Sequence, residues 1–185
     1  MASFYSMARQ LVLINGLPGA GKTTLAASLA EAMAIPLLSK DALKEELAAS
    51  DLALNTPQQL GVRASELLWS RAAAQPNTVI AESWWYKPRD LAFVTQGLKR
   101  SNAHSAVEIW CSAATKVVRE RYRSRVRSPL HHDHERMATD WETWARNAQP
   151  LAICPTILVD TSSAVDIEPL INAVLETLPT SSLIH

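Results

Sequence analysis

Eight residues near the amino terminus have the types and spacing that bind phosphate. Gly16 to Thr23 read Gly-Leu-Pro-Gly-Ala-Gly-Lys-Thr and fit the pattern G-x-x-x-x-G-K-[ST]. The glycines allow successive backbone N–H groups to curl around an anion. Lys22 is then expected to reach the β and γ phosphates of a nucleotide, and the Thr23 hydroxyl to hold Mg²⁺. The predicted nucleotide-binding residues are Gly16, Leu17, Pro18, Gly19, Ala20, Gly21, Lys22, Thr23 and Thr24.

The segments on either side of this loop are those that such a loop requires. Residues 10–15 form a short apolar run of strand length. Residues 24–33 are rich in Ala and Leu and predict a helix whose amino terminus points at the anion. A glycine turn followed by an accidental Lys-Thr pair would lack this context, so the sequence favours nucleotide binding.

The rest of the chain alternates short apolar runs with segments of helical period. Five predicted strands with helices between them indicate parallel crossovers and a doubly wound α/β sheet. We expect one domain covering residues 1–185. Ligands of such sheets lie beyond the carboxyl ends of the strands. The residues at or just after those ends are Asn15, Lys40, Asp41, Glu82, Cys111 and Asp160.

The composition limits the classes of function. The 185 residues are 48% hydrophobic and 19% charged, as in globular rather than disordered proteins. Eighteen basic and eighteen acidic residues cancel, so no overall field attracts nucleic acid or an anionic membrane. No apolar run reaches transmembrane length, and Cys111 and Cys154 match no metal or redox spacing. We therefore expect a cytoplasmic protein with no membrane partner.

Three features together resemble a known family. They are Gly16 to Thr24, the Ser39-Lys40-Asp41 step, and the arginine-rich segment before Ser128-Pro129-Leu130-His131-His132-Asp133. The sequence is similar to the small P-loop kinases of the AAA_33, zeta-toxin and chloramphenicol-phosphotransferase group, which also includes polynucleotide 5′-hydroxyl kinase domains. The resemblance implies a three-layer P-loop NTPase sandwich with strand order 2-3-1-4-5, an arginine-rich lid at about 119–138, and use of ATP and Mg²⁺.

Asp41 is the predicted catalytic carboxylate. Phosphoryl transfer needs a positioned nucleophile, and a carboxylate after strand two can orient a hydroxyl and accept its proton. The resemblance implies the catalytic base at this step. The alternative is that Asp41 caps the following helix.

Glu82 is the predicted metal residue besides Thr23. In the P-loop fold that the resemblance implies, strand three lies next to strand one, so its terminal acid can hold Mg²⁺ or its water shell. The alternatives for Glu82 are substrate binding or a capping arrangement with Ser83.

The arginines of the predicted lid fall on two helix faces. Arg119, Arg123 and Arg127 recur every four residues, whereas Arg121 and Arg125 share another face. Guanidinium groups match phosphate oxygens and neutralise transition-state charge. We expect Arg123 and Arg127 to contact the transferring phosphate and act in catalysis together with Lys22. For Arg121 and Arg125 we prefer a solvated face.

Two further clusters follow. Trp84 and Trp85 come after strand three, and adjacent residues of a strand cannot both face one core. We predict that they line an acceptor pocket, with core packing as the alternative. His131-His132-Asp133-His134-Glu135 is too tightly spaced to converge on one metal ion, so we expect a solvated lid tip, in which His131 alone can lie near the substrate.

The sequence therefore predicts an ATP- and Mg²⁺-dependent kinase that phosphorylates a hydroxyl of a small molecule. A polynucleotide 5′-hydroxyl kinase is one alternative, but the basic track that it needs is barely provided by Lys40, Lys44 and Arg63. A non-kinase regulatory NTPase is another. The sequence leaves open the acceptor, the choice between ATP and GTP, and the oligomeric state.

Overall fold

A five-stranded parallel sheet forms the centre of the molecule. The computed structural model describes residues 9–50, 56–126 and 128–178. The strands are β1 (Gln10–Asn15), β2 (Leu37–Ser39), β3 (Val79–Glu82), β4 (Ser105–Ser112) and β5 (Thr156–Asp160). Their order is β2-β3-β1-β4-β5, and every neighbouring pair is parallel. This confirms the expected doubly wound sheet of order 2-3-1-4-5.

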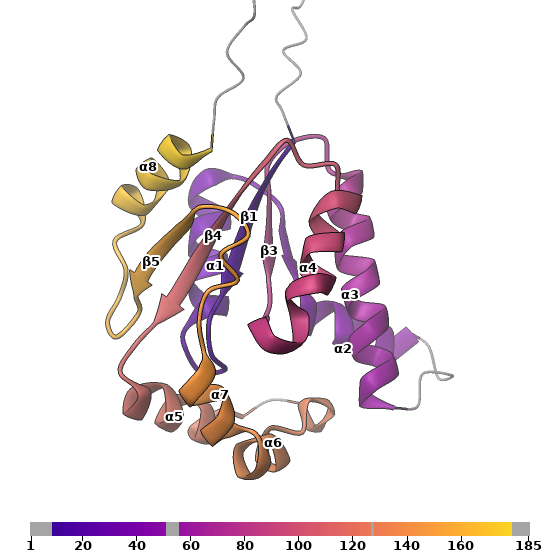
Figure 1. Cartoon of the computed structure of the whole chain (residues 1–185), viewed down its shortest axis with the longest axis vertical. Helices are drawn as coiled ribbons and strands as arrows, with labels where there is room; N and C mark the ends of the chain where they lie inside the picture. Colours follow the sequence, from indigo (N-terminus) through magenta and orange to yellow (C-terminus); the bar gives the residue numbers. More distant parts are fainter. Residues whose placement is uncertain (1–8, 51–55, 127, 179–185) are drawn as a thin grey trace, which may run out of the picture.

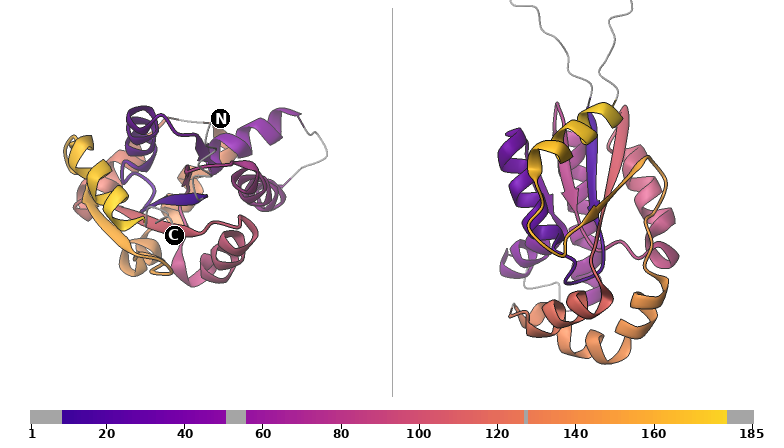
Figure 2. Two further views of the ribbon diagram at one scale, coloured as in Figure 1. Left: turned by 90° about the horizontal axis from the view of Figure 1, so that it is seen from above. Right: turned by 90° about the vertical axis from the view of Figure 1, so that its left-hand side faces the viewer.

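Helices cover both faces of the sheet (Figures 1 and 2). On one side lie α1 (Lys22–Met33) and α8 (Ile167–Thr177), and on the other α2 (Lys40–Ser50), α3 (Pro57–Ala74) and α4 (Lys87–Arg100). The central strand β1 serves both cores, since Val12 and Ile14 pack on the first side and Leu11 and Leu13 on the second. All four side chains are fully buried, as expected for the middle strand of a parallel sheet.

The lid elements lie together beyond the carboxyl ends of the strands, at the bottom of Figure 1. They are α5 (Thr115–Ser124), the short 3-10 helix η1 (Pro129–His131), α6 (Asp133–Thr139) and α7 (Trp141–Asn147). Trp141 and Trp144 of α7 are buried, and Trp141 stacks on Tyr122 of α5 with ring centroids 5.8 Å apart. The stack joins α7 to α5, and all three aromatic residues belong to the core cluster that also contains Val12 and Ile14 of β1.

No helix within the described ranges is both long enough and apolar enough to cross a bilayer.

Candidate functional site

The predicted phosphate-binding loop connects β1 to α1 in a conformation that requires glycine. Gly16, Gly19 and Gly21 have φ values of 147°, 89° and 79°, in the region that side chains disfavour. A Cβ atom on Gly19 would lie 2.4 Å from the carbonyl oxygen of Val118, and one on Gly16 would lie 2.4 Å from that of Cys111. The loop therefore packs closely on α5 and on the end of β4, and these residues fit a phosphate cradle.

Lys22 is buried at the start of α1. Its Nζ donates a hydrogen bond to the carbonyl oxygen of Leu17 at 2.9 Å, across the loop. Burial lowers the pKa of Lys22, while the nearby charges of Glu82 and Asp41 act to raise it. An anion bound in the loop would compensate this desolvated ammonium group.

Glu82 joins the loop to the second strand. Its two carboxylate oxygens accept hydrogen bonds from Thr23 Oγ1 at 3.3 Å and from Ser39 Oγ at 2.7 Å, and the side chain is only 3% exposed. Since α4 begins at Lys87, Glu82 does not cap a helix with Ser83.

Hydroxyl and carboxylate oxygens are ligands that suit Mg²⁺. The parts of the chain that the structure describes contain no cluster of three carboxylate, histidine or cysteine ligands. Thr23 and Glu82 therefore fit a Mg²⁺ ion that takes its remaining ligands from phosphate and water, which is the usual arrangement at phosphoryl-transfer sites.

Asp41 faces the same small cavity as the loop. This central cavity has a volume of about 100 Å³ and is lined, among others, by Lys22, Thr23, Asp41, Glu82 and Trp84. Because α2 begins at Lys40, directly after β2, Asp41 lies inside its first turn and past the capping position. The structure thus brings the predicted base within one cavity of the predicted phosphate and metal residues.

The lid contacts α2 through His131, contrary to our expectation of a solvated tip. His131 is 3% exposed; its Nε2 lies 2.8 Å from Glu45 Oε1, and its Nδ1 lies 3.7 Å from Asp41 Oδ1. Lys44 Nζ donates to the carbonyl oxygen of Leu130 at 3.0 Å. Only the next residues match the expectation, since His132 pairs with Glu135 at the surface. His131 therefore does not belong to a solvated tip; it lines the central cavity beside Asp41, where a residue near the substrate would lie.

The arginine faces are the reverse of those that we predicted. Arg125 lines both the central cavity and a smaller groove along the phosphate loop. Arg121 donates to the carbonyl oxygens of Thr161 at 2.8 Å and Ser162 at 2.9 Å. The expectation of a solvated face for this pair is therefore wrong.

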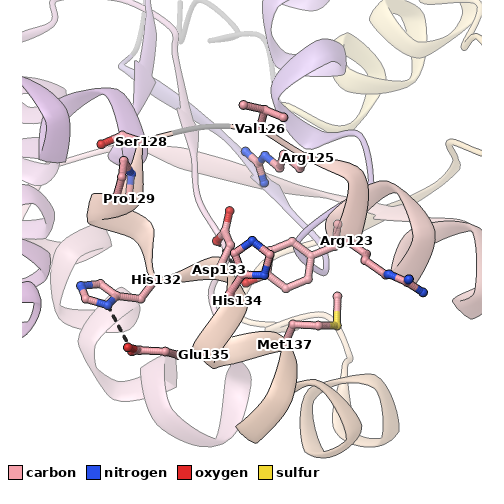
Figure 3. Close-up of a pocket in the computed structure, with 11 residues that line it drawn as sticks. Arg123, Arg125, Val126, Ser128, Pro129, His132, Asp133, His134, Glu135 and Met137 are labelled. Atoms are coloured by element: carbon pink, nitrogen blue, oxygen red, sulfur yellow. Dashed lines mark hydrogen bonds and ion pairs between the residues drawn. The ribbon is translucent and has the colours of Figure 1, made fainter.

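Arg123, by contrast, is exposed and does not line the central cavity; it borders a cavity of about 450 Å³ among the lid elements, which Arg125 also lines. In Figure 3 its side chain extends away from that of Arg125. Our expectation that Arg123 contacts the transferring phosphate is not supported by this placement. Arg127 lies outside the described residues.

The rotation of α5 explains the difference. Val118 and Tyr122 are buried in the core, Arg121 lies one turn after Val118 on α5, and Arg125 is the extended residue that directly follows the helix. These four residues therefore border one inner face. In the sequence, the positions of Val118 and Tyr122 indicate which arginines face the core, whereas the four-residue spacing of the arginines does not.

Trp84 and Trp85 point in different directions. Trp84 lines the central cavity and packs near Trp110 and Trp144, with ring centroids 6.3 and 6.1 Å away. Trp85 is 3% exposed and stacks on Trp69 in the other core, at 6.1 Å. The prediction that Trp85 lines the acceptor pocket is wrong, because successive residues of extended chain face opposite sides.

A buried network around Glu108 was missed at the sequence level. This fully buried carboxylate in β4 accepts hydrogen bonds, all of 3.0 Å, from Asn15 Nδ2 and from the backbone N–H groups of Leu151 and Ala152. Asn15 Oδ1 in turn accepts from the N–H groups of Gly16 and Trp85. The network ties the start of the phosphate loop to the chain returning from the lid. An acidic residue in the middle of an otherwise apolar strand was its only signal.

A further cavity of about 430 Å³ adjoins the phosphate loop. It lies between α1 and the segment that connects β5 to α8, and Thr24, Ser28, Arg121, Thr161 and Val165 are among its lining residues. Together with the groove along the loop, it gives an extended ligand room to continue away from the central cavity.

Solved structures with the same fold include three that are described as kinases or candidate kinases. A candidate kinase from Chloroflexus aurantiacus J-10-fl is 27% identical with a TM-score of 0.76, over 93% of this chain and 100% of that one. A sugar kinase from Janibacter sp. HTCC2649 is 18% identical with a TM-score of 0.58, over 91% and 93% of the two chains. A gluconokinase from Sinorhizobium meliloti 1021 is 16% identical with a TM-score of 0.56, over 91% of each chain.

No curated protein matches the sequence. The model of the AAA_33 family, described as an AAA domain, matches residues 11–151. With a P-loop of the expected geometry at the end of β1 and this match over most of its length, the chain belongs to the AAA_33 family and has the nucleotide-binding P-loop NTPase fold.

Proposed function

We propose that the protein is an ATP- and Mg²⁺-dependent kinase that phosphorylates a hydroxyl group of a small molecule. One observation carries this proposal: the carboxylate of Asp41 faces the same cavity as Lys22, Thr23 and Glu82, and the lid covers that cavity through His131. A nucleotide-binding loop alone would need no second carboxylate opposite the phosphates. A transfer site does, because the acceptor must be held in line with the transferred group.

The residues divide the reaction between them. The acceptor hydroxyl oxygen forms a bond to the γ-phosphorus of ATP, the bond from that phosphorus to the β–γ bridging oxygen breaks, and ADP leaves. Asp41 orients the hydroxyl and takes its proton. Lys22 and Arg125 neutralise the charge on the transferred group. Mg²⁺, held by Thr23 with Glu82 nearby, would supply further charge neutralisation.

The cavity favours a small acceptor. Its volume of about 100 Å³ falls well below the ~300–1,000 Å³ of typical sites for drug-sized ligands. Trp84 offers an aromatic wall on which the apolar face of a sugar or polyol can stack. The sugar kinase and the gluconokinase that share the fold act, by their names, on polyhydroxylated compounds. A polyhydroxylated small molecule is therefore the acceptor class that we propose.

A polynucleotide end is less favoured. Lys44 is buried and bound to the carbonyl oxygen of Leu130, and Arg63 is paired with Glu66 at 2.8 Å on an exposed part of α3. Neither residue extends a basic track from Asp41 over the surface. Salt-sensitive binding of single-stranded nucleic acid would contradict this view.

A transfer assay tests the proposed function. Polyols and sugars are incubated with ATP labelled at the γ position, and labelled product is measured for the wild type, Lys22→Ala and Asp41→Asn. We expect label in product only with the wild type, while Asp41→Asn still binds ATP. ATP consumption that continues in Asp41→Asn without any transfer to an added hydroxyl would point to a regulatory NTPase instead.

A further inference from the structure

Six Lys and Arg side chains line the central cavity: Lys22, Lys40, Lys44, Arg89, Arg125 and Arg136. Lys22 and Arg125 lie at the phosphate loop. Lys40, in the first turn of α2, and Arg89, in the first turn of α4, follow the ends of β2 and β3, whereas the loop follows β1. Asp41 acts electrostatically on both Lys22 and Lys40, and β3 separates the end of β2 from the end of β1 in the sheet. A phosphate in the loop therefore leaves Lys40 and Arg89 on the acceptor side.

Lys40 has no direct counter-ion. Its side chain is half-buried in the cavity wall, and within the described ranges it has no hydrogen-bond or ion-pair partner. Burial lowers its pKa; Asp90 and Asp41 act to raise it, whereas Arg89 and Lys44 act in the same direction as burial. Lys40 is thus a partly desolvated cation whose nearby acids do not reach it.

Asp90, the acid with the largest electrostatic effect on Lys40, already accepts hydrogen bonds from other groups. Asp90 accepts hydrogen bonds from Nε and Nη2 of Arg89, both at 2.7 Å, and from the N–H group of Tyr86 at 2.8 Å. The Nη1 group of Arg89 makes no hydrogen bond to any described residue. Among the described residues, neither Lys40 Nζ nor Arg89 Nη1 has a protein acceptor; Lys40 is half-buried, whereas the Arg89 side chain is 50% exposed and its Nη1 is open to solvent.

We propose that the acceptor is an acidic polyol, whose carboxylate or phosphate group is bound by Lys40 and Arg89 while one of its hydroxyl groups lies at Asp41. This inference rests on the proposed kinase function and narrows its substrate class. A negative group at this position would pair the desolvated ammonium and use the remaining face of a guanidinium group that Asp90 already fixes in place. A neutral sugar would leave the Lys40 ammonium group without a counter-ion.

The test compares acceptors that differ only in charge. Six-carbon substrates are offered with γ-labelled ATP in three forms: the neutral alditol sorbitol, the aldonate gluconate, and sorbitol 6-phosphate. The same three forms are offered at four and five carbons. We expect kcat/KM to be at least about a hundredfold higher for one acidic form than for the neutral form of equal length, because two charge-assisted hydrogen bonds are at stake. Faster turnover of gluconate would show that the bound group is a carboxylate, and faster turnover of sorbitol 6-phosphate would show that it is a phosphate.

Substitution of Lys40 identifies the binding group. Lys40→Met should raise KM for the acidic substrate about tenfold to a hundredfold, change kcat little, and leave KM for the neutral form unaltered. Lys40→Arg should restore most of the binding, which separates loss of charge from damage to α2. Lys99→Met serves as the matched control, because Lys99 is exposed in the last turn of α4, far from the cavity end of that helix. It should match the wild type.

The outcomes are distinct. Equal turnover of neutral and acidic forms, with Lys40→Met unaffected, would overturn the acidic-acceptor inference and leave the kinase proposal standing. Absence of transfer to every form by the wild-type protein would overturn the proposed polyol kinase itself.

Discussion

Replacing Arg125 by methionine tests the arginine that the structure brings to the central cavity. Methionine keeps much of the apolar stem of the side chain and removes only the charge. Arg125 lines the cavity beside Lys22, and its charge acts on that lysine. Arg123, two residues earlier in the last turn of α5, is exposed and does not line the central cavity, so Arg123→Met provides a matched control.

The size of the effect follows from the charge that Arg125 stabilises. A full charge pair ~4 Å apart is worth about 4 kcal/mol at an effective dielectric constant of ~20. If a third to two thirds of this develops only as the phosphoryl group is transferred, the loss is about 1.4–2.7 kcal/mol, or roughly tenfold to a hundredfold in kcat. Arg123→Met should change kcat by less than about twofold.

The assay is steady-state phosphoryl transfer under saturating ATP, with the dissociation constant of ATP measured separately by titration calorimetry. Arg125→Met should lower kcat more than it weakens ATP binding, since the stabilised charge develops during transfer. A larger loss of kcat in Arg123→Met than in Arg125→Met would refute the assignment of faces on α5.

Four further predictions concern other residues. Asp41→Asn should lower kcat by about a hundredfold or more, the scale of general-base loss, while the dissociation constant of ATP stays near that of the wild type; an unchanged kcat would reduce Asp41 to a structural residue. His131→Asn should raise KM for the acceptor and speed cleavage of the lid in limited proteolysis, because it removes the contact with Glu45 of α2. Proteolysis at the wild-type rate would disprove the proposal that this contact holds the lid on α2. Glu108→Ala should lower the free energy of unfolding by about 2–4 kcal/mol in urea titration, because three buried donors lose their acceptor, and a loss under ~0.5 kcal/mol would contradict this. Burial raises the pKa of Cys111 to about 12 and that of Cys154 to about 12. Unfolded thiols ionise at a pH of ~8.5, so the unfolded state loses protons before the folded state does. The free energy of unfolding should therefore fall as the pH rises above that value. In the folded protein the thiols should react slowly with iodoacetamide at pH 8, and rapid alkylation would show that their pKa values are not raised.

The fold was largely predictable because its signals are local. The spacing from Gly16 to Thr23 sets the loop conformation within eight residues, and the apolar run that precedes it fills both cores as β1. Alternation of strands and helices was enough to predict a parallel sheet. The strand order came from the family resemblance, since nothing in the local pattern distinguishes the neighbours of β1.

The position of a site residue was predictable only where it depends on the strand or loop that contains it. The loop and Glu82 lie where the ends of β1 and β3 put them. The role of Arg125 depends on how α5 is rotated, which Val118 and Tyr122 decide through packing. Burial of His131 depends on a contact with Glu45, 86 residues earlier, and such long-range docking leaves no periodic trace in the sequence.

The Glu108 network also bears on how local motions in the protein are coupled. The Glu108 carboxylate joins Asn15 to the chain returning from the lid, and Asn15 joins the entry of the phosphate loop to the Trp85 backbone, so none of these segments can open without breaking hydrogen bonds of the others. Proteins open in cooperative units whose free energies are set by such shared contacts. The amide protons of Gly16, Trp85, Leu151 and Ala152 should therefore exchange with solvent as one group, which means that the donor site and the base of the lid share a single opening equilibrium.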